Sequence, residues 1–160
     1  MTVLSMLVEN IQRKFSNGCP NGFLLGWDVN RFFKSLLSLF VGFKVINDTD
    51  FNYSYCNSYD IELGTGEDGK MFILTLKASF IADTYTIHVT KYSKNKRSGK
   101  VIHIEEYREY AGEVVKARSF MEEQGFIEIL DDDMELFVEN VDLELAERAT
   151  VGKCLFDDFE

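Results

Sequence analysis

The sequence is poor in the residues around which many metal and catalytic sites are built. Its 160 residues include two histidines, three cysteines, one proline and one tryptophan. The cysteines, Cys19, Cys56 and Cys154, lie far apart and form no CxxC or CxxH pair, which excludes the common zinc and disulfide frameworks. Three separate thiols in a chain of this size are typical of a reducing compartment.

Long apolar segments are also missing. No run approaches the ~18 residues that a membrane-spanning helix requires. The first fifteen residues, MTVLSMLVENIQRKF, have no basic stretch ahead of an apolar one and no small-residue cleavage site. We therefore expect a cytoplasmic protein with no membrane partner. With few turn-forming residues and no low-complexity stretch, residues 1–160 are expected to form one globular domain.

Basic side chains are scarce relative to acidic ones. There are 17 Lys and Arg against 27 Asp and Glu, a net charge of −10 and a pI of about 4.7. Such a chain lacks the clustered cations that phosphate contacts need, so no nucleic-acid partner is expected. The basic stretch 91–100 is expected to be the end of a hairpin.

The acidity is concentrated in residues 120–160. This segment holds fourteen acidic side chains and two basic ones, Arg148 and Lys153, a local net charge of −12. Because it is also rich in Phe, Leu, Val and Ile, it is expected to fold rather than to form a tail. A folded acidic surface attracts basic proteins or keeps a chain soluble.

Hydrophobic periodicity predicts an α+β fold. Apolar residues recur at helical spacing near both ends of the first forty residues, and the period changes to two after residue 50. Short connections between successive strands favour an antiparallel meander. N-terminal helices then pack on this sheet together with one later helix. We predict helices over 2–15, 28–41 and 112–124, and strands over 51–56, 59–63, 71–80, 84–92, 100–108, 126–130, 141–145 and 151–156.

The segment Gly64-Thr65-Gly66-Glu67-Asp68-Gly69-Lys70 fits two phosphate-binding patterns, GxGxxG and GxxxxGK. Both patterns require a helix directly afterwards, whereas the residues 71–76 have the pattern of a strand. Glu67 and Asp68 would repel phosphate. We interpret the segment as a hairpin turn and expect no nucleotide or other small-molecule ligand.

The sequence gives little support for a metal site or a cofactor site. His88 and His103 fall on neighbouring predicted strands and can face each other, but no third ligand follows from their spacing. The run Asp131–Glu135 fails the calcium-loop pattern, because its sixth and twelfth positions are Leu136 and Asp142. We interpret the run as an exposed turn between two predicted strands, or as a patch that faces a partner. We predict no cofactor, no metal and no enzymatic activity.

The acidic residues and the aromatic residues beside them are instead candidates for binding a partner. Carboxylates steer association with a basic surface, and Tyr or Phe side chains supply buried anchors. The predicted partner-binding residues are Glu105, Tyr107, Glu109, Tyr110, Asp131, Asp132, Asp133, Glu135, Phe137, Glu139, Asp142 and Glu144.

In general character the chain resembles the immunity proteins of bacterial polymorphic-toxin and contact-dependent growth inhibition systems. The resemblance covers Gly22-Phe23-Leu24-Leu25 ahead of the predicted helix 28–41, the β meander, and the segment Val141–Glu147. It implies tight one-to-one neutralisation of a toxin domain with a basic surface, often a nuclease.

Two alternatives remain open at this point. The acidic surface can serve an adaptor or self-assembling domain that has no catalytic activity. An enzyme can also be built from separated carboxylates such as Glu105, Glu109 and Asp131, if the fold brings them into one pocket.

Overall fold

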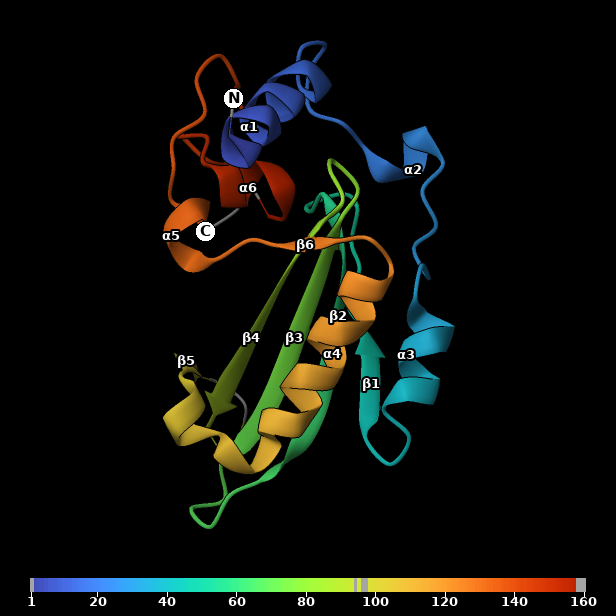
Figure 1. Ribbon diagram of the computed structural model, residues 1–160, viewed down its shortest axis with the longest axis vertical. Helices are drawn as coiled ribbons and strands as arrows, with labels where there is room; N and C mark the ends of the chain where they lie inside the picture. Colours follow the sequence, from blue (N-terminus) through green and yellow to red (C-terminus); the bar gives the residue numbers. More distant parts are fainter. Residues whose placement is uncertain (1, 94, 96–97, 158–160) are drawn as a thin grey trace.

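A six-stranded, mostly antiparallel sheet forms the centre of the protein (Figure 1). The computed structural model describes residues 2–93, 95 and 98–157. Five strands follow one another in the order β1-β2-β3-β4-β5, and β6 pairs in parallel with the start of β4. The predicted α+β class and meander are therefore confirmed. The strands are β1 (Lys44–Asn47), β2 (Cys56–Thr65), β3 (Met71–Ser79), β4 (Thr84–Tyr92), β5 (Gly99–Ile102) and β6 (Ile127–Glu128).

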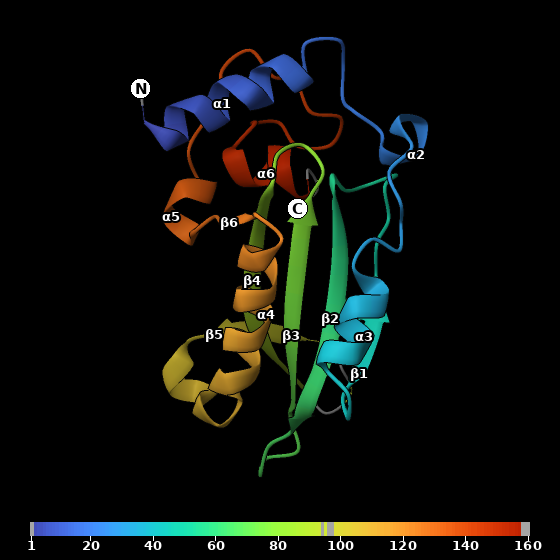
Figure 2. The ribbon, with the colours of Figure 1, turned by 45° about the vertical axis from the view of Figure 1, so that its right-hand side comes forward.

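Helices cover one face of the sheet and one of its ends (Figures 1 and 2). Helices α3 and α4 pack on the face, whereas α1 and α6 lie beyond the end where β4 begins. Two 3-10 turns, η1 (Ile104–Glu106) and η2 (Arg108–Tyr110), connect β5 to α4. The helices are α1 (Val3–Lys14), α2 (Gly22–Leu25), α3 (Phe33–Leu39), α4 (Ala111–Glu123), α5 (Asp131–Met134) and α6 (Val151–Leu155). None of the described helices is long and apolar enough to cross a membrane.

Tight hairpins hold the three long strands in register. The glycine-rich segment connects β2 to β3 as a turn, as predicted, with Gly69 at φ +77° and the Asp68 side chain accepting from the Lys70 amide. Residues 80–83 connect β3 to β4. Since a strand follows the glycines, the helix that would cradle a phosphate is absent from this position.

Alternation along these strands gives the sheet two different faces. On the face toward α3 and α4, Tyr59, Leu76 and Ile87 lie opposite one another across the strands. The next row, Asp60, Thr75 and His88, points to the other face. No described helix covers this second, polar face in either ribbon view (Figures 1 and 2).

A second apolar cluster closes the end of the sheet against α1 and α6. Ile11 of α1 and Phe15, which follows that helix, meet the buried Phe51, Tyr55 and Phe80 beside the ends of β2 and β3. The C-terminal residues Ala149, Val151, Cys154, Leu155 and Phe156 complete it. Residues near both ends of the described chain are thereby brought into one core.

The structure corrects three predicted elements in the acidic part of the chain. Residues 151–155 form α6 and not a strand, because the Thr150 hydroxyl caps the first turn by accepting from the Lys153 amide. The segment 141–145 has no strand, although its alternation holds Val141 in the core. Asp131–Met134, predicted as a turn, forms α5, where the acidic residues occupy the favourable first turn.

Other predicted boundaries shift. The helix predicted over 28–41 is confined to α3, since residues 29–32 form turns and Phe32 has a left-handed φ of 72°. Residues 51–53 are turns, and the strand predicted at 59–63 extends back to Cys56. The sequence did not reveal β1. The strand predicted over 100–108 ends at Ile102, so His103 caps η1 and does not pair with His88.

Candidate functional site

The uncovered face of the sheet is hollowed into a polar trough. Its largest part has a volume of about 630 Å³ and lies over β2, β3 and β4, bounded by residues 48–54. A neighbouring hollow of about 330 Å³ shares Lys77, His88 and Asp157 with it. A third, of about 370 Å³, shares Thr86 and continues past the edge of β4 to α5. We call these three hollows together the acidic trough.

Carboxylates dominate its lining. Eight acidic and three basic side chains line the trough, a formal charge of −5 with His88 neutral. Two of the three cations are held in ion pairs within the trough, Lys77 by Asp157 and Arg118 by Glu128. The acidic residues are Asp48, Asp50, Asp60, Glu128, Asp131, Asp132, Glu135 and Asp157, and the basic residues are Lys77, Arg118 and Lys153.

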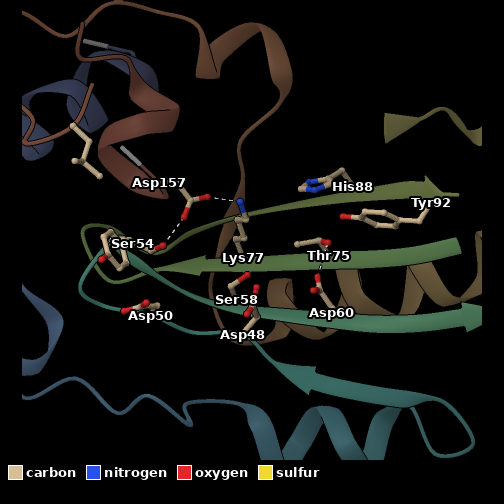
Figure 3. Close-up of a pocket in the computed structure, with 12 residues that line it drawn as sticks. Asp48, Asp50, Ser54, Ser58, Asp60, Thr75, Lys77, His88, Tyr92 and Asp157 are labelled. Atoms are coloured by element: carbon tan, nitrogen blue, oxygen red, sulfur yellow. Dashed lines mark hydrogen bonds and ion pairs between the residues drawn. The ribbon is translucent and has the colours of Figure 1, made fainter. Parts of the chain in front are cut away.

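Lys77 sits at the middle of the trough and is neutralised by the chain itself (Figure 3). Its ammonium group forms an ion pair with Asp157, whose other carboxylate oxygen accepts from Ser54 Oγ at 2.6 Å. Burial lowers the pKa of Lys77, but the Asp157 charge and hydrogen bond outweigh it and raise the pKa overall. Lys77 therefore stays charged and remains paired with Asp157.

Asp60 has no such cation. Its Oδ1 accepts a 2.7 Å hydrogen bond from Thr75 Oγ1 on the neighbouring strand. Burial raises the pKa of Asp60, the Thr75 hydrogen bond opposes this, and the nearby Asp48 charge adds to the rise. None of the ion pairs between described residues involves Asp60 or Asp48.

His88 occupies the next position along the same row. Burial lowers its pKa to about 4, and the Lys77 charge contributes in the same direction. Asp131 and Asp157 oppose the shift only partly. The imidazole is therefore neutral near pH 7. Within the described part of the chain, no group of three His, Cys, Asp or Glu side chains is arranged to hold a metal ion.

The trough contains three of the predicted partner-binding residues. Asp131 and Asp132 from the first turn of α5 line its third part, and Glu135 lines its second. Asp133 belongs to the same turn. Phe137 is 49% exposed and lies against the Arg148 guanidinium at 4.8 Å, outside the trough. The predicted residues Glu139, Asp142 and Glu144 are exposed on the segment between α5 and α6.

The remaining predicted residues form a separate group. Glu105, Tyr107, Glu109 and Tyr110 lie on η1 and η2, just before α4, whereas α5 follows the other end of that helix. At 1.5 Å per residue, α4 separates the two groups by about 20 Å. Glu105 and Glu109 therefore do not share a pocket with Asp131, and the three-carboxylate active site considered above is not assembled.

The two tyrosines of this group are parts of the fold. Tyr107 and Tyr110 are partly buried against the apolar cluster under α4, and the Tyr110 ring lies 5.5 Å from that of Phe72. Packing against this cluster explains why tyrosines occur at these two positions. Of the four predicted residues in this group, only Glu105 and Glu109 are exposed.

Sequence reasoning missed the centre of the trough, which Asp48, Asp60, Lys77, His88 and Asp157 form. A signal was present in the strands, because Ser58, Asp60, Thr75, Lys77, Thr86 and His88 occupy alternate positions on three successive strands. Such alternation indicates that one face of the sheet is polar. It does not indicate that the C-terminal Asp157 folds back onto that face.

No protein-family model matches this chain, and no curated protein or solved structure shows significant similarity to it.

Proposed function

We propose that the chain is an immunity protein, which binds a cognate toxin domain with a basic surface through the acidic trough and α5. The toxin domain is of a class that acts on nucleic acid, since a groove that binds phosphate is lined by Lys and Arg. Carboxylates seated in that groove take the place of phosphates and block the substrate. The chain acts by binding and performs no reaction.

The observation that supports this proposal is the excess charge of a concave surface. A formal charge of −5 is gathered in the trough, while Asp48 and Asp60 have no ion-pair partner among the described residues. A partner's Lys and Arg side chains compensate these charges on binding. The exposed Glu139, Asp142 and Glu144 extend the same negative electrostatic potential and speed association with the partner.

The test is capture of the tagged chain from its native lysate at low salt, followed by a neutralisation assay. We expect one stoichiometric basic polypeptide, which arrests growth when expressed alone. Co-expression of the present chain restores growth. If the captured polypeptide is harmless, or if the chain does not relieve its toxicity, the immunity function is wrong.

The same experiment separates the adaptor alternative. An adaptor or self-assembling domain uses the acidic surface on a scaffold or on a second copy. It is then recovered alone as an oligomer, or with a non-toxic protein whose activity it does not change. Light scattering of the purified chain at low and high salt distinguishes those two forms.

A further inference from the structure

We propose that the hollow between Asp48, Ser58 and Asp60 is a receptor for one guanidinium group, an arginine side chain of the bound partner. The source of this arginine rests on the proposed function. The chemistry of the pocket is independent of that function, because it follows from groups on three adjoining segments of the sheet.

The two carboxylates are placed side by side by main-chain pairing. The Asp48 amide donates to the Ser58 carbonyl at 2.8 Å, one step beyond the β1–β2 ladder. Asp48 is thereby set against the stretch of β2 that carries Ser58 and Asp60. The negative charge of Asp48 raises the pKa of Asp60, so the two carboxylates repel each other. The planar fork of an arginine bridges two carboxylates better than a point charge does.

Ser58 supplies a second, independent indication of a ligand. The residue is only 8% exposed and lines the hollow, in the row that also holds Lys77 (Figure 3). Its main-chain amide donates to Thr49 Oγ1, but no described residue hydrogen-bonds to its hydroxyl oxygen. The hydroxyl is accessible from the hollow, where it can accept a hydrogen bond from a ligand donor or from water.

Among the residues that the structure describes, no cation forms an ion pair with Asp48 or Asp60. Lys77, the basic side chain in the lining of this hollow, is held by Asp157. The Thr75 hydroxyl satisfies one oxygen of Asp60 and leaves the carboxylate free to accept from a ligand. Since three metal-ligating side chains are not grouped anywhere in the described chain, an organic cation fits better than a metal ion.

Aromatic rings complete the pocket. Tyr53 and Tyr92 both line the hollow, and a guanidinium stacks on the face of a tyrosine ring. The volume of about 630 Å³ accommodates an arginine side chain with its own main chain at the rim. A free amino acid would also bring its α-carboxylate close to Asp48 and Asp50, where it is repelled.

The first experiment titrates the ¹⁵N-labelled full chain with N-acetyl-arginine amide, N-acetyl-lysine amide and free arginine, followed by amide chemical shifts. We expect saturable shifts around Ser58, Asp60, Thr75 and His88, with the arginine amide binding at least threefold more tightly than the other two compounds. Equal binding of the lysine amide, or shifts spread equally over α5, overturns the proposal. If free arginine binds more tightly than the arginine amide, the pocket is a site for the free amino acid. The proposal that the arginine belongs to the bound partner is then wrong.

Variants make the test specific. Asp60→Asn keeps the shape of the side chain and its contact with Thr75. We expect it to weaken the affinity for the arginine amide about tenfold. Ser58→Ala weakens it about threefold. Glu67→Gln, in the exposed turn between β2 and β3 and outside the trough, is the control and leaves this affinity unchanged. Unaltered affinity in a folded Asp60→Asn protein contradicts the proposal.

Failure of this inference is distinguishable from failure of the proposed function. If the chain neutralises a toxin but Asp60→Asn captures that toxin as well as wild type does, only the arginine receptor is wrong. If no toxin is captured but the arginine amide binds as described, the receptor stands and the proposed function falls.

Discussion

At the scale of single residues, His88 makes folding depend on pH. Its pKa of about 4 in the folded chain lies below the 6.5 of an exposed histidine. Protons therefore bind the unfolded chain more readily as the pH falls through this interval, and stability is lost. For one histidine the loss between pH 6.5 and 4 amounts to about 3 kcal/mol.

We predict that His88→Gln removes most of this pH dependence. Urea unfolding of wild type and variant at several pH values between 7 and 4 gives the difference due to His88 alone, since shifts in Asp60 and other groups are common to both. The exposed His103→Gln is the control and follows wild type. Parallel pH profiles for wild type and His88→Gln would show that the imidazole is not buried as described.

The ion pair of Lys77 and Asp157 gives a second residue-scale prediction. The two side chains are 23% and 16% exposed, so removal of one charge leaves the other partly desolvated. We expect Asp157→Asn to lower the free energy of unfolding by about 2 kcal/mol. Urea unfolding measures it. Adding Lys77→Met to Asp157→Asn then recovers part of the loss, and strictly additive losses in this double-mutant cycle would contradict the pairing.

At the scale of elements, one glycine shows how closely α5 and α6 approach each other, and a second provides a comparison. A Cβ on Gly152 of α6 would lie 3.0 Å from Met134 Cβ and 3.3 Å from the Met134 carbonyl oxygen, both in α5. A Cβ on Gly112 of α4 would meet nothing within 4 Å. The two positions thus offer the same substitution in opposite surroundings.

We predict that Gly152→Ala destabilises the protein by about 1–2 kcal/mol through this overlap. Gly112→Ala stabilises it by up to about 1 kcal/mol, since alanine is the better helix former. Thermal unfolding of the two variants beside wild type measures both changes in stability, one a loss and the other a gain. A stabilised Gly152→Ala protein would mean that α5 is not seated on α6.

The acidic turn of α5 can be tested against the glutamates of η1 and η2. We predict that Lys in place of Asp131, Asp132 and Asp133 together slows association with the partner at low salt and leaves the chain folded. The matched control carries Lys at Glu105, Glu106 and Glu109, beyond the other end of α4, and associates as wild type does. Unchanged kinetics for the α5 variant, or slowing by the control alone, would move the interface to η1 and η2.

Elements with strong local signals were predictable from the sequence. Helices α1 and α4 and the β3–β4 hairpin show clear apolar periodicity, and their predicted bounds are close to those observed. Prediction failed at α6, because Val151 and Phe156 favour strands and the Thr150 cap is the main indication of a helix. It failed at β1 because four residues with Lys44 at one end carry little pattern.

At the scale of the whole molecule, the two apolar clusters meet around Arg31 and Trp27. The Arg31 guanidinium lies 4.9 Å from the Trp27 ring and 5.4 Å from that of Phe126, which belongs to the cluster under the sheet helices. Trp27 also stacks on Phe80 of the end cluster at 5.9 Å. The single tryptophan thus reports on the junction.

We predict that both clusters unfold together. Trp27 fluorescence and far-ultraviolet circular dichroism should then give one coincident urea transition, because β2 contributes residues to both clusters. The exposed Tyr53→Phe variant serves as the control and leaves both curves in place. An earlier fluorescence transition would show that the α1–α6 end opens as a unit of its own and would contradict a single domain.

The candidate site lay beyond sequence reasoning for reasons of topology. Local pattern marks Asp131–Glu135 as exposed and acidic, and three of these residues do reach the trough. The rest of the trough depends on which strands adjoin and on the return of residues 156–157 to β2 and β3. Pairings between distant segments leave no spacing signal in one sequence.

Those distant pairings also set an order of folding. Ser54 meets Asp157 over 103 residues, and Gln12 reaches the Glu139 carbonyl over 127, whereas the β2–β3 and β3–β4 hairpins close over short turns. Long loops cost more entropy to close and slow the rate of folding. We therefore expect the meander to form first, and the half of the trough walled by α5 and Asp157 to form last. A newly made chain would then acquire its sheet before it acquires its full acidic trough.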